Sequence, residues 1–152
     1  KGSAMKDSPY AIARVWPGLW IGNVAAALQP PVPVTALLNV AAERDLDAPR
    51  CLYHKIPIVD GLPIPQEQLR EAVCWIHRHL PRHRILLFCN AGVRRAPSVA
   101  VGYLCCFAGM SFGQAVEHVA RQKPHITLVP ELICTVDAVR KQLAKAGSTE
   151  PR

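Results

Sequence analysis

The sequence predicts an α/β domain with a central, mainly parallel sheet flanked by helices. Short apolar runs at 35–41, 51–59 and 85–88 have the length and composition of buried strands. Apolar residues at helical spacing occupy 66–80 and 97–107, and strands that alternate with helices are typical of this class. The chain has 152 residues, half of them hydrophobic, which is enough for one domain with a sizeable core.

The single domain is expected to span residues 8–146. Residues 1–7 start with KGSAM, which is typical of an expression remnant, so we expect them to be disordered and outside the fold. Residues 147–152, GSTEPR, have the composition of a frayed tail. No apolar run reaches the roughly 18 residues of a membrane helix, and no signal peptide is visible. We therefore expect a cytoplasmic protein.

The N-terminal half carries the signals of strands and loops. The segment 18–24, GLWIGNV, is typical of a short strand followed by a turn. Proline-rich or polar segments at 29–34, 43–50 and 60–65 separate the apolar runs. Because proline lacks a backbone donor and these segments are rich in turn residues, we expect all three to be loops.

Two helices are expected on either side of the strand at 85–88. The helix over 66–80 should end at Pro81, which cannot continue it. The helix over 97–107 is apolar on nearly every side, which predicts that it is buried, and Gly109 lies just past its end.

The C-terminal segment should form two more helices. Ser111 and Gln114 have the spacing of a capping box for a helix that ends near Lys123. Pro130 is suited to the first position of a last helix, whose apolar pattern continues over 131–146.

The positive charge of the chain is concentrated in one stretch. The formal net charge is +7, and no acidic residue occurs between Glu71 and Glu117. The same stretch contains Arg78, Arg82, Arg84, Arg94, Arg95, His77, His79 and His83. This distribution favours an anionic partner, although the run 77–84 alone is also consistent with a solvated basic face. Nucleic acid is a weaker candidate, because the arginines are not interleaved with aromatic residues and no nucleic-acid motif is present.

The cysteines and histidines do not have the spacing of a metal site. The six cysteines are Cys51, Cys74, Cys89, Cys105, Cys106 and Cys134, and none of them forms a CxxC pair. We expect free thiols in a reducing compartment rather than a disulfide framework. His77, His79 and His83 lie close together in the sequence, but Pro81 breaks any helical register between them. No metal and no cofactor are therefore expected.

One short stretch, LLFCNAGVRRAPS at 86–98, carries the strongest functional signal. It places Cys89 at the end of an apolar strand that should be covered on both faces, and Arg95 six positions later. The residues between them let backbone N–H groups point inward, and the following helix adds the positive end of its dipole. Such a loop binds a tetrahedral dianion and stabilises a thiolate nucleophile, while an arginine holds two phosphate oxygens. The expected phosphate-binding residues are Asn90, Ala91, Gly92, Val93, Arg94 and Arg95.

Asp60 is the best candidate for a general acid. Attack on a phosphate ester by a thiolate requires a proton for the leaving oxygen. Asp60 follows a predicted strand, and ligands of α/β sheets bind beyond the carboxyl ends of the strands. The alternative is an ordinary turn aspartate, because Asp-Gly is a common turn. The remaining acidic residues considered, Asp45, Asp47, Glu67 and Glu71, are expected to be solvated.

These motifs resemble the cysteine-based protein tyrosine phosphatase superfamily, and within it the small, atypical dual-specificity phosphatases. IPIVD is similar to the family's general-acid loop, CNAGVRRAPSVAVGYL to its signature loop and helix, and ARQKPHI to a turn before its last helix. The resemblance implies a three-layer domain with Cys89 as nucleophile, Arg95 as phosphate binder and Asp60 as general acid. It also implies a cysteinyl-phosphate intermediate, phosphorylated proteins as partners, and a shallow pocket that admits phosphotyrosine, phosphoserine and phosphothreonine.

Three residues depart from the family pattern. Phe88 stands where the family usually has histidine, Ala96 where it has serine or threonine, and Arg94 where it has a small residue. The RAP sequence is similar to plant glucan phosphatases of the same superfamily, so Ala96 alone does not imply inactivity.

Three functions therefore remain open. The first is dual-specificity dephosphorylation of proteins. The second is hydrolysis of a non-protein phosphate, such as a phosphoglucan, a phosphoinositide or an RNA 5′-phosphate. The third is a non-catalytic phosphate-binding module.

Overall fold

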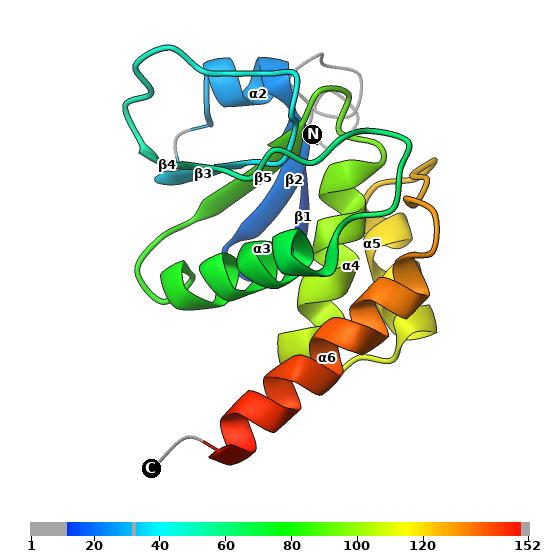
Figure 1. The fold of residues 1–152 in the computed structure, drawn as a ribbon. Helices are drawn as coiled ribbons and strands as arrows, with labels where there is room; N and C mark the ends of the chain where they lie inside the picture. Colours follow the sequence, from blue (N-terminus) through cyan, green and yellow to red (C-terminus); the bar gives the residue numbers. More distant parts are fainter. Residues whose placement is uncertain (1–11, 32, 150–152) are drawn as a thin grey trace.

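A computed structural model describes residues 12–31 and 33–149 of the chain, and in this part it contains a five-stranded sheet (Figure 1). The strands are β1 (Ile12–Trp16), β2 (Leu19–Asn23), β3 (Ala36–Asn39), β4 (Leu52–Lys55) and β5 (Ile85–Cys89). Their order is β1-β2-β5-β3-β4, and only the β1–β2 pair is antiparallel. The predicted mainly parallel sheet is confirmed.

The helices cover the two faces of the sheet unequally. They are α2 (Val24–Leu28), α3 (Gln66–His79), α4 (Arg95–Phe107), α5 (Phe112–Gln122) and α6 (Leu132–Thr149). The four long helices pack together on one face, with α4 in contact with α3, α5, α6 and β5 (Figure 1). The other face is covered by the short α2 and by Leu46 and Cys51 from the loop before β4. The three-layer arrangement is present, with one layer much thinner than the other.

The central strand β5 is buried along its whole length, as its apolar sequence predicts. Because successive side chains of a strand point to opposite faces, Ile85, Leu87 and Cys89 join the cluster beneath the long helices. Leu86 and Phe88 join the smaller cluster beneath α2. Cys89 therefore ends the strand on the same face as α4.

Three features differ from the predicted strands and loops. The strand expected over 51–59 ends at Lys55, because Pro57 has no N–H to continue the ladder. The turn after β2 continues into the unpredicted helix α2, whose cap is Asn23: its side chain accepts a hydrogen bond from the Ala26 N–H at 2.9 Å. The strand β1, which forms an edge of the sheet, was also not predicted.

The helices agree with the prediction apart from their ends. The capping box of Ser111 and Gln114 is confirmed. Helix α4 begins at Arg95, two positions earlier than expected, and Pro97 fits its first turn because no donor is needed there. The last helix begins after Pro130 rather than at it, since Glu131 has φ 58°, which is outside the helical region. It also continues beyond the expected end at 146.

The expected remnant at 1–7 lies outside the described residues, as do residues 150–152 at the tail. Among the helices that the structure describes, none combines the length and the apolar character that a membrane crossing requires.

Candidate active site

Cys89 is held at the junction of β5 and α4. Its side chain is buried, with 2% of the residue exposed. The sulfur accepts a hydrogen bond from the backbone N–H of Ala96, in the first turn of α4, at 3.4 Å. The N-terminus of a helix stabilises negative charge, so this position is suited to a thiolate.

The loop between the strand and the helix is fixed by its carbonyl groups. The carbonyl of Asn90 accepts from the N–H of Val24 at 3.3 Å, and that of Val93 accepts from the N–H of Thr127 at 2.8 Å. In a planar trans peptide the N–H points opposite to the carbonyl. The N–H groups of Ala91 and Arg94 therefore point away from these neighbours, which is the arrangement that an anion-binding loop requires.

Gly92 is the residue that lets this loop lie against β2. Its φ of 76° lies in the left-handed region, which favours glycine. A Cβ at this position would approach the carbonyl carbon and oxygen of Gly22 to 2.8 Å. Both the backbone conformation and the close contact therefore exclude a larger residue.

Arg95, the first residue of α4, is buried and firmly oriented. Its Nη1 and Nη2 donate to the two carboxylate oxygens of Glu43 at 2.7 and 2.6 Å, and Nη1 also donates to the carbonyl of Ile58 at 2.9 Å. The hydrogen bond from Arg95 lowers the pKa of Glu43 to about 2. The same contact raises the pKa of Arg95 above its ordinary value. The guanidinium is thus fixed in one plane before any ligand binds.

Glu43 is a site residue that the sequence interpretation missed. It was included in a polar loop at 43–50, with no role of its own. A usable signal existed, because Glu43 follows the apolar run 35–41 at the carboxyl end of a predicted strand. The same rule that selected Asp60 therefore applied to it.

The Nε of Arg95 is buried and lacks a hydrogen-bond partner among the described residues. The Oδ1 atom of Asp60 lies 3.7 Å from this nitrogen. Asp60 is half-exposed, and its Oδ1 also lies 3.4 Å from Nη1 of Arg94. The structure therefore brings Asp60 to the same loop as Cys89 and Arg95, as the sequence predicted.

Arg94 has contacts that the sequence did not indicate. We expected it among the phosphate-binding residues, but its side chain extends to Asp60 and to Thr127, whose hydroxyl accepts from its Nε at 3.2 Å. Its backbone N–H remains part of the loop described above. The side chain is thus engaged by two other segments of the chain.

The carboxylates expected to be solvated are exposed, and two of them contact a basic side chain. Asp45 accepts from Lys55 at 2.6 Å, and Glu71 lies 2.7 Å from the imidazole of His54.

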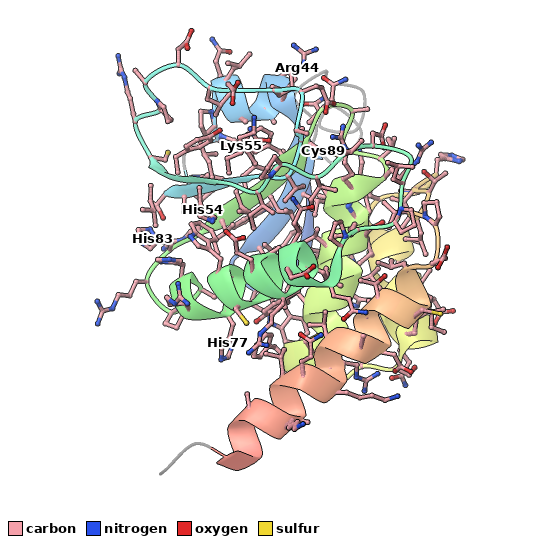
Figure 2. All side chains as sticks on the ribbon, viewed as in Figure 1. Arg44, His54, Lys55, His77, His83 and Cys89 are labelled. Carbon is pink, nitrogen blue, oxygen red and sulfur yellow. The ribbon has the colours of Figure 1, made fainter. Side chains whose placement is uncertain are left out.

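A further arginine borders the loop between β5 and α4, since Nε of Arg44 donates to the side chain of Asn90 at 2.8 Å. Figure 2 shows Arg44 and Cys89 at the same end of the molecule, far from His77.

Two of the departures from the family pattern lie beneath the loop. Phe88 is fully buried, and its ring packs with Ala26, Ala27 and Leu37 under α2, on the face opposite to Cys89. Ala96 is also fully buried, and it reaches the sulfur only through its backbone N–H.

Each histidine near 77–83 contacts another type of residue, and the rings of His79 and His83 also contact each other edge to face. His77 stacks on Phe107, His79 lies against Trp75, and His83 contacts the hydroxyl of Thr35. Within 12–31 and 33–149, no group of three or more histidine, cysteine or acidic residues is arranged to hold a metal ion.

Comparison with known proteins shows similarity to dual specificity phosphatases. No family model matches the chain. Mouse dual specificity protein phosphatase 13B is 26% identical over 129 residues, which cover 71% of this chain and 62% of that protein. Mouse dual specificity protein phosphatase 15 is 23% identical over 119 residues, which cover 74% of this chain and 51% of that protein. The matched region thus spans between half and two thirds of the length of these curated relatives.

A solved structure extends the likeness to the whole fold. The crystal structure of a mouse putative dual specificity phosphatase, complexed with zinc tungstate, superimposes with a TM-score of 0.78 at 24% identity. The match covers 96% of each chain. The chain is thus similar in sequence to dual specificity phosphatases and shares the fold of this solved structure, in agreement with the resemblance stated from the sequence.

Proposed function

We propose that this chain, a relative of the small dual-specificity phosphatases, hydrolyses phosphate monoesters through a cysteinyl-phosphate intermediate. The observation that carries the proposal is the position of the Cys89 sulfur at the N-terminus of α4, next to an arginine whose orientation is already fixed. A nucleophile, an anion-binding loop and a carboxyl group lie together there, which is the set that phosphoryl transfer to a side chain requires.

In the first step, the thiolate of Cys89 attacks phosphorus, so that a P–S bond forms and the P–O bond of the ester breaks. Protonated Asp60 gives its proton to the leaving oxygen. Arg95 and the N–H groups of the loop bind the equatorial oxygens, whose charge they stabilise in the transition state.

In the second step, water attacks the phosphocysteine, and the ionised Asp60 takes a proton from that water. The P–S bond breaks, inorganic phosphate leaves and the thiolate of Cys89 is restored. No metal ion enters either step, so EDTA should leave the rate unchanged. Loss of activity that a divalent cation restores would contradict this route.

We propose phosphorylated proteins as the substrates, with phosphotyrosine, phosphoserine and phosphothreonine all accepted. The names of the curated relatives and the open rim of the site support this choice, because Ala91, Val93 and Asp60 are exposed around the buried sulfur. A panel of phosphopeptides, a phosphoglucan, phosphoinositides and an RNA 5′-phosphate separates this class from the non-protein phosphates. Preference for one of the latter by kcat/KM would reject it.

Cys89→Ser tests the function directly. The variant should lose turnover of para-nitrophenyl phosphate while it still binds phosphate, because a serine hydroxyl in the same place is a far weaker nucleophile. Hydrolysis at the wild-type rate by this variant would reject the nucleophile. Absence of any hydrolysis by the wild type, with phosphate binding retained, would favour a non-catalytic binding module.

We also propose a reducing compartment, the cytoplasm, as the place of action. All six cysteines are free thiols, and the nucleophile is active only as a free thiolate.

A further inference from the structure

The side chain of Arg94 joins two segments that are distant in the sequence. Its Nη1 lies 3.4 Å from Oδ1 of Asp60, 34 residues earlier, and its Nε donates to the hydroxyl of Thr127, 33 residues later, at 3.2 Å. These contacts use different nitrogens of one planar guanidinium, so they can exist together. Thr127 is itself anchored, because its backbone N–H binds the carbonyl of Val93.

We propose that Arg94 is a positioning residue that holds Asp60 beside the leaving-group side of the phosphate-binding loop, with Thr127 as the anchor of its guanidinium. This inference rests on the proposed function and assigns to Arg94 a role other than that of a phosphate ligand.

The segment that carries Asp60 is anchored at Ile58, which is buried and whose carbonyl accepts from Arg95 and from the N–H of Ala42, and we expect the turn beyond Ile58 to need a further contact. It has left the sheet at Lys55, and Gly61 takes a φ of 80°. The neighbouring Val59 and Leu62 are exposed, so their side chains add little packing. Arg94 approaches this turn closely, since its Nη1 lies 4.0 Å from the place of a Cβ on Gly61.

Arg94 also keeps Asp60 out of the phosphate site. The buried Nε of Arg95, which has no hydrogen-bond partner in the described chain, lies 3.7 Å from the same Oδ1. Without Arg94, the carboxylate is free to pair with this nitrogen and to occupy the place of a phosphate oxygen. The same oxygen thus lies between the two arginines, and we expect the contact with Arg94 to compete with Nε of Arg95 for it.

If Arg94 only stabilised the fold, its loss would lower the thermal stability of the protein. The Arg94 and Asp60 side chains are 39% and 51% exposed, and ion pairs of this kind contribute little to the stability of a fold. Loss of Arg94 should therefore leave thermal unfolding unchanged within error. Its effect should instead appear wherever the proton from Asp60 limits the reaction.

The test compares Arg94→Gln with the wild type on two substrates. For phenyl phosphate, whose leaving group needs a proton, kcat/KM should fall about tenfold, which is part of the roughly 10²- to 10⁴-fold that a positioned acid supplies, because the acid is displaced rather than removed. For an aryl phosphate with a strongly activated leaving group, kcat/KM should change less than twofold. Arg94→Lys should recover part of the loss, because an ammonium can reach the carboxylate but cannot also hold Thr127.

Two further variants make the result specific. Thr127→Val removes only the hydroxyl and should give the same substrate dependence with a smaller loss. In an Asp60→Asn background, Arg94→Gln should cost nothing more, since the carboxyl group that it positions is gone. Arg121→Gln, which removes an exposed arginine paired with Glu117 in α5, is the matched control and should change neither substrate.

Amide hydrogen exchange over 57–62 tests the positioning independently of turnover. Arg94→Gln should raise the exchange rate at Gly61 severalfold, while Arg121→Gln should not. Unchanged exchange, or equal losses of kcat/KM on both substrates, would overturn the role of Arg94. If the wild type hydrolyses neither ester, the proposed function fails, and the exchange at Gly61 still decides whether Arg94 holds the turn.

Discussion

Glu43 and Arg95 are 52 residues apart in the chain and are joined by two hydrogen bonds of 2.7 and 2.6 Å between their charged groups. The arginine is buried, whereas the carboxylate has an exposed side chain fraction of 46%. A residue at the surface therefore sets the plane of a guanidinium inside the site.

Glu43→Gln should weaken catalysis without unfolding the protein. The amide keeps the shape of the side chain, but it offers one acceptor and places an NH₂ group against the guanidinium. Hydrogen bonds between charged groups contribute about 1.5–3 kcal/mol, so kcat/KM should fall by roughly 10- to 100-fold. Steady-state kinetics measures the loss, with Glu117→Gln on α5 as control. An unchanged kcat/KM would show that Arg95 is oriented without Glu43.

The same pair predicts how stability depends on acid. The pKa of Glu43 is lowered from 4.5 to about 2 in the folded chain, chiefly by its hydrogen bond to Arg95. The folded state therefore binds the proton less readily than the unfolded state, and the stabilisation is complete above pH 4.5. It is lost as pH falls from 4.5 toward 2. Melting temperatures between pH 6 and 3 should fall more steeply in the wild type than in Glu43→Gln, and parallel curves would contradict this.

Gly92→Ala should disrupt the site, whereas Gly113→Ala should not. The first substitution puts a Cβ 2.8 Å from the backbone of Gly22 on a residue with φ 76°. We expect the free energy of unfolding to fall by about 1–2 kcal/mol from the left-handed conformation alone. Phosphate binding should also be lost, because the loop shifts. Gly113 lies in α5 with open space around it. Because alanine is a better helix former than glycine, Gly113→Ala should raise the free energy of unfolding by about 1 kcal/mol. Chemical denaturation and phosphate titration measure both effects.

Ala96→Ser should speed the second step of the reaction if release of the thiolate is limiting. The sulfur accepts the Ala96 N–H at 3.4 Å, and this position supplies no hydroxyl for the departing thiolate. Rapid mixing with para-nitrophenyl phosphate should show a burst followed by slow turnover in the wild type. The steady-state rate of the serine variant should be about tenfold higher, which corresponds to an activation free energy lower by roughly 1.4 kcal/mol. The burst rate should not change. A wild type without a burst, and a variant without a gain, would place the limiting step elsewhere.

Phe88→His should destabilise the fold. The ring is fully buried in the cluster beneath α2, whose other buried members are all apolar. The cost of burying an unpaired polar group is about 1–3 kcal/mol, and the smaller ring also leaves part of the cluster unfilled. Phe88→Leu keeps the site apolar and should lose less. If histidine lost no more stability than leucine in chemical denaturation, the imidazole would have found a partner.

The parts of the site that the sequence predicted are those with local signals. Cys89, Gly92 and Arg95 share one loop between a strand and a helix, so the geometry of a few consecutive residues decides their positions. Asp60 was found because the carboxyl ends of neighbouring strands meet at one edge. The comparisons do not test its role, which stays a prediction.

The parts that the sequence did not predict depend on which segments become neighbours. Glu43 reaches Arg95 because β3 pairs with β5, and nothing in the loop at 43–50 reveals that order. The contacts of Arg94 need the turn before α6 to lie beside the loop, which is a matter of helix packing. Helix α2 was missed because five residues between a strand and a proline-rich segment carry little periodicity.

The long separations between these partners also determine when the site forms during folding. Glu43, Asp60, the 89–95 loop and Thr127 belong to four distant stretches of chain, and the parallel pairs of β5 close large loops before any of them can meet. Closing such loops costs chain entropy, which makes topologies of this kind slow to fold. We therefore expect that isolated fragments, or a nascent chain that has not yet been made as far as Thr127, do not assemble the proposed phosphate-binding site. During refolding, anion binding should therefore recover later than the circular dichroism signal of the helices. Its recovery would mark the point at which the whole domain has folded.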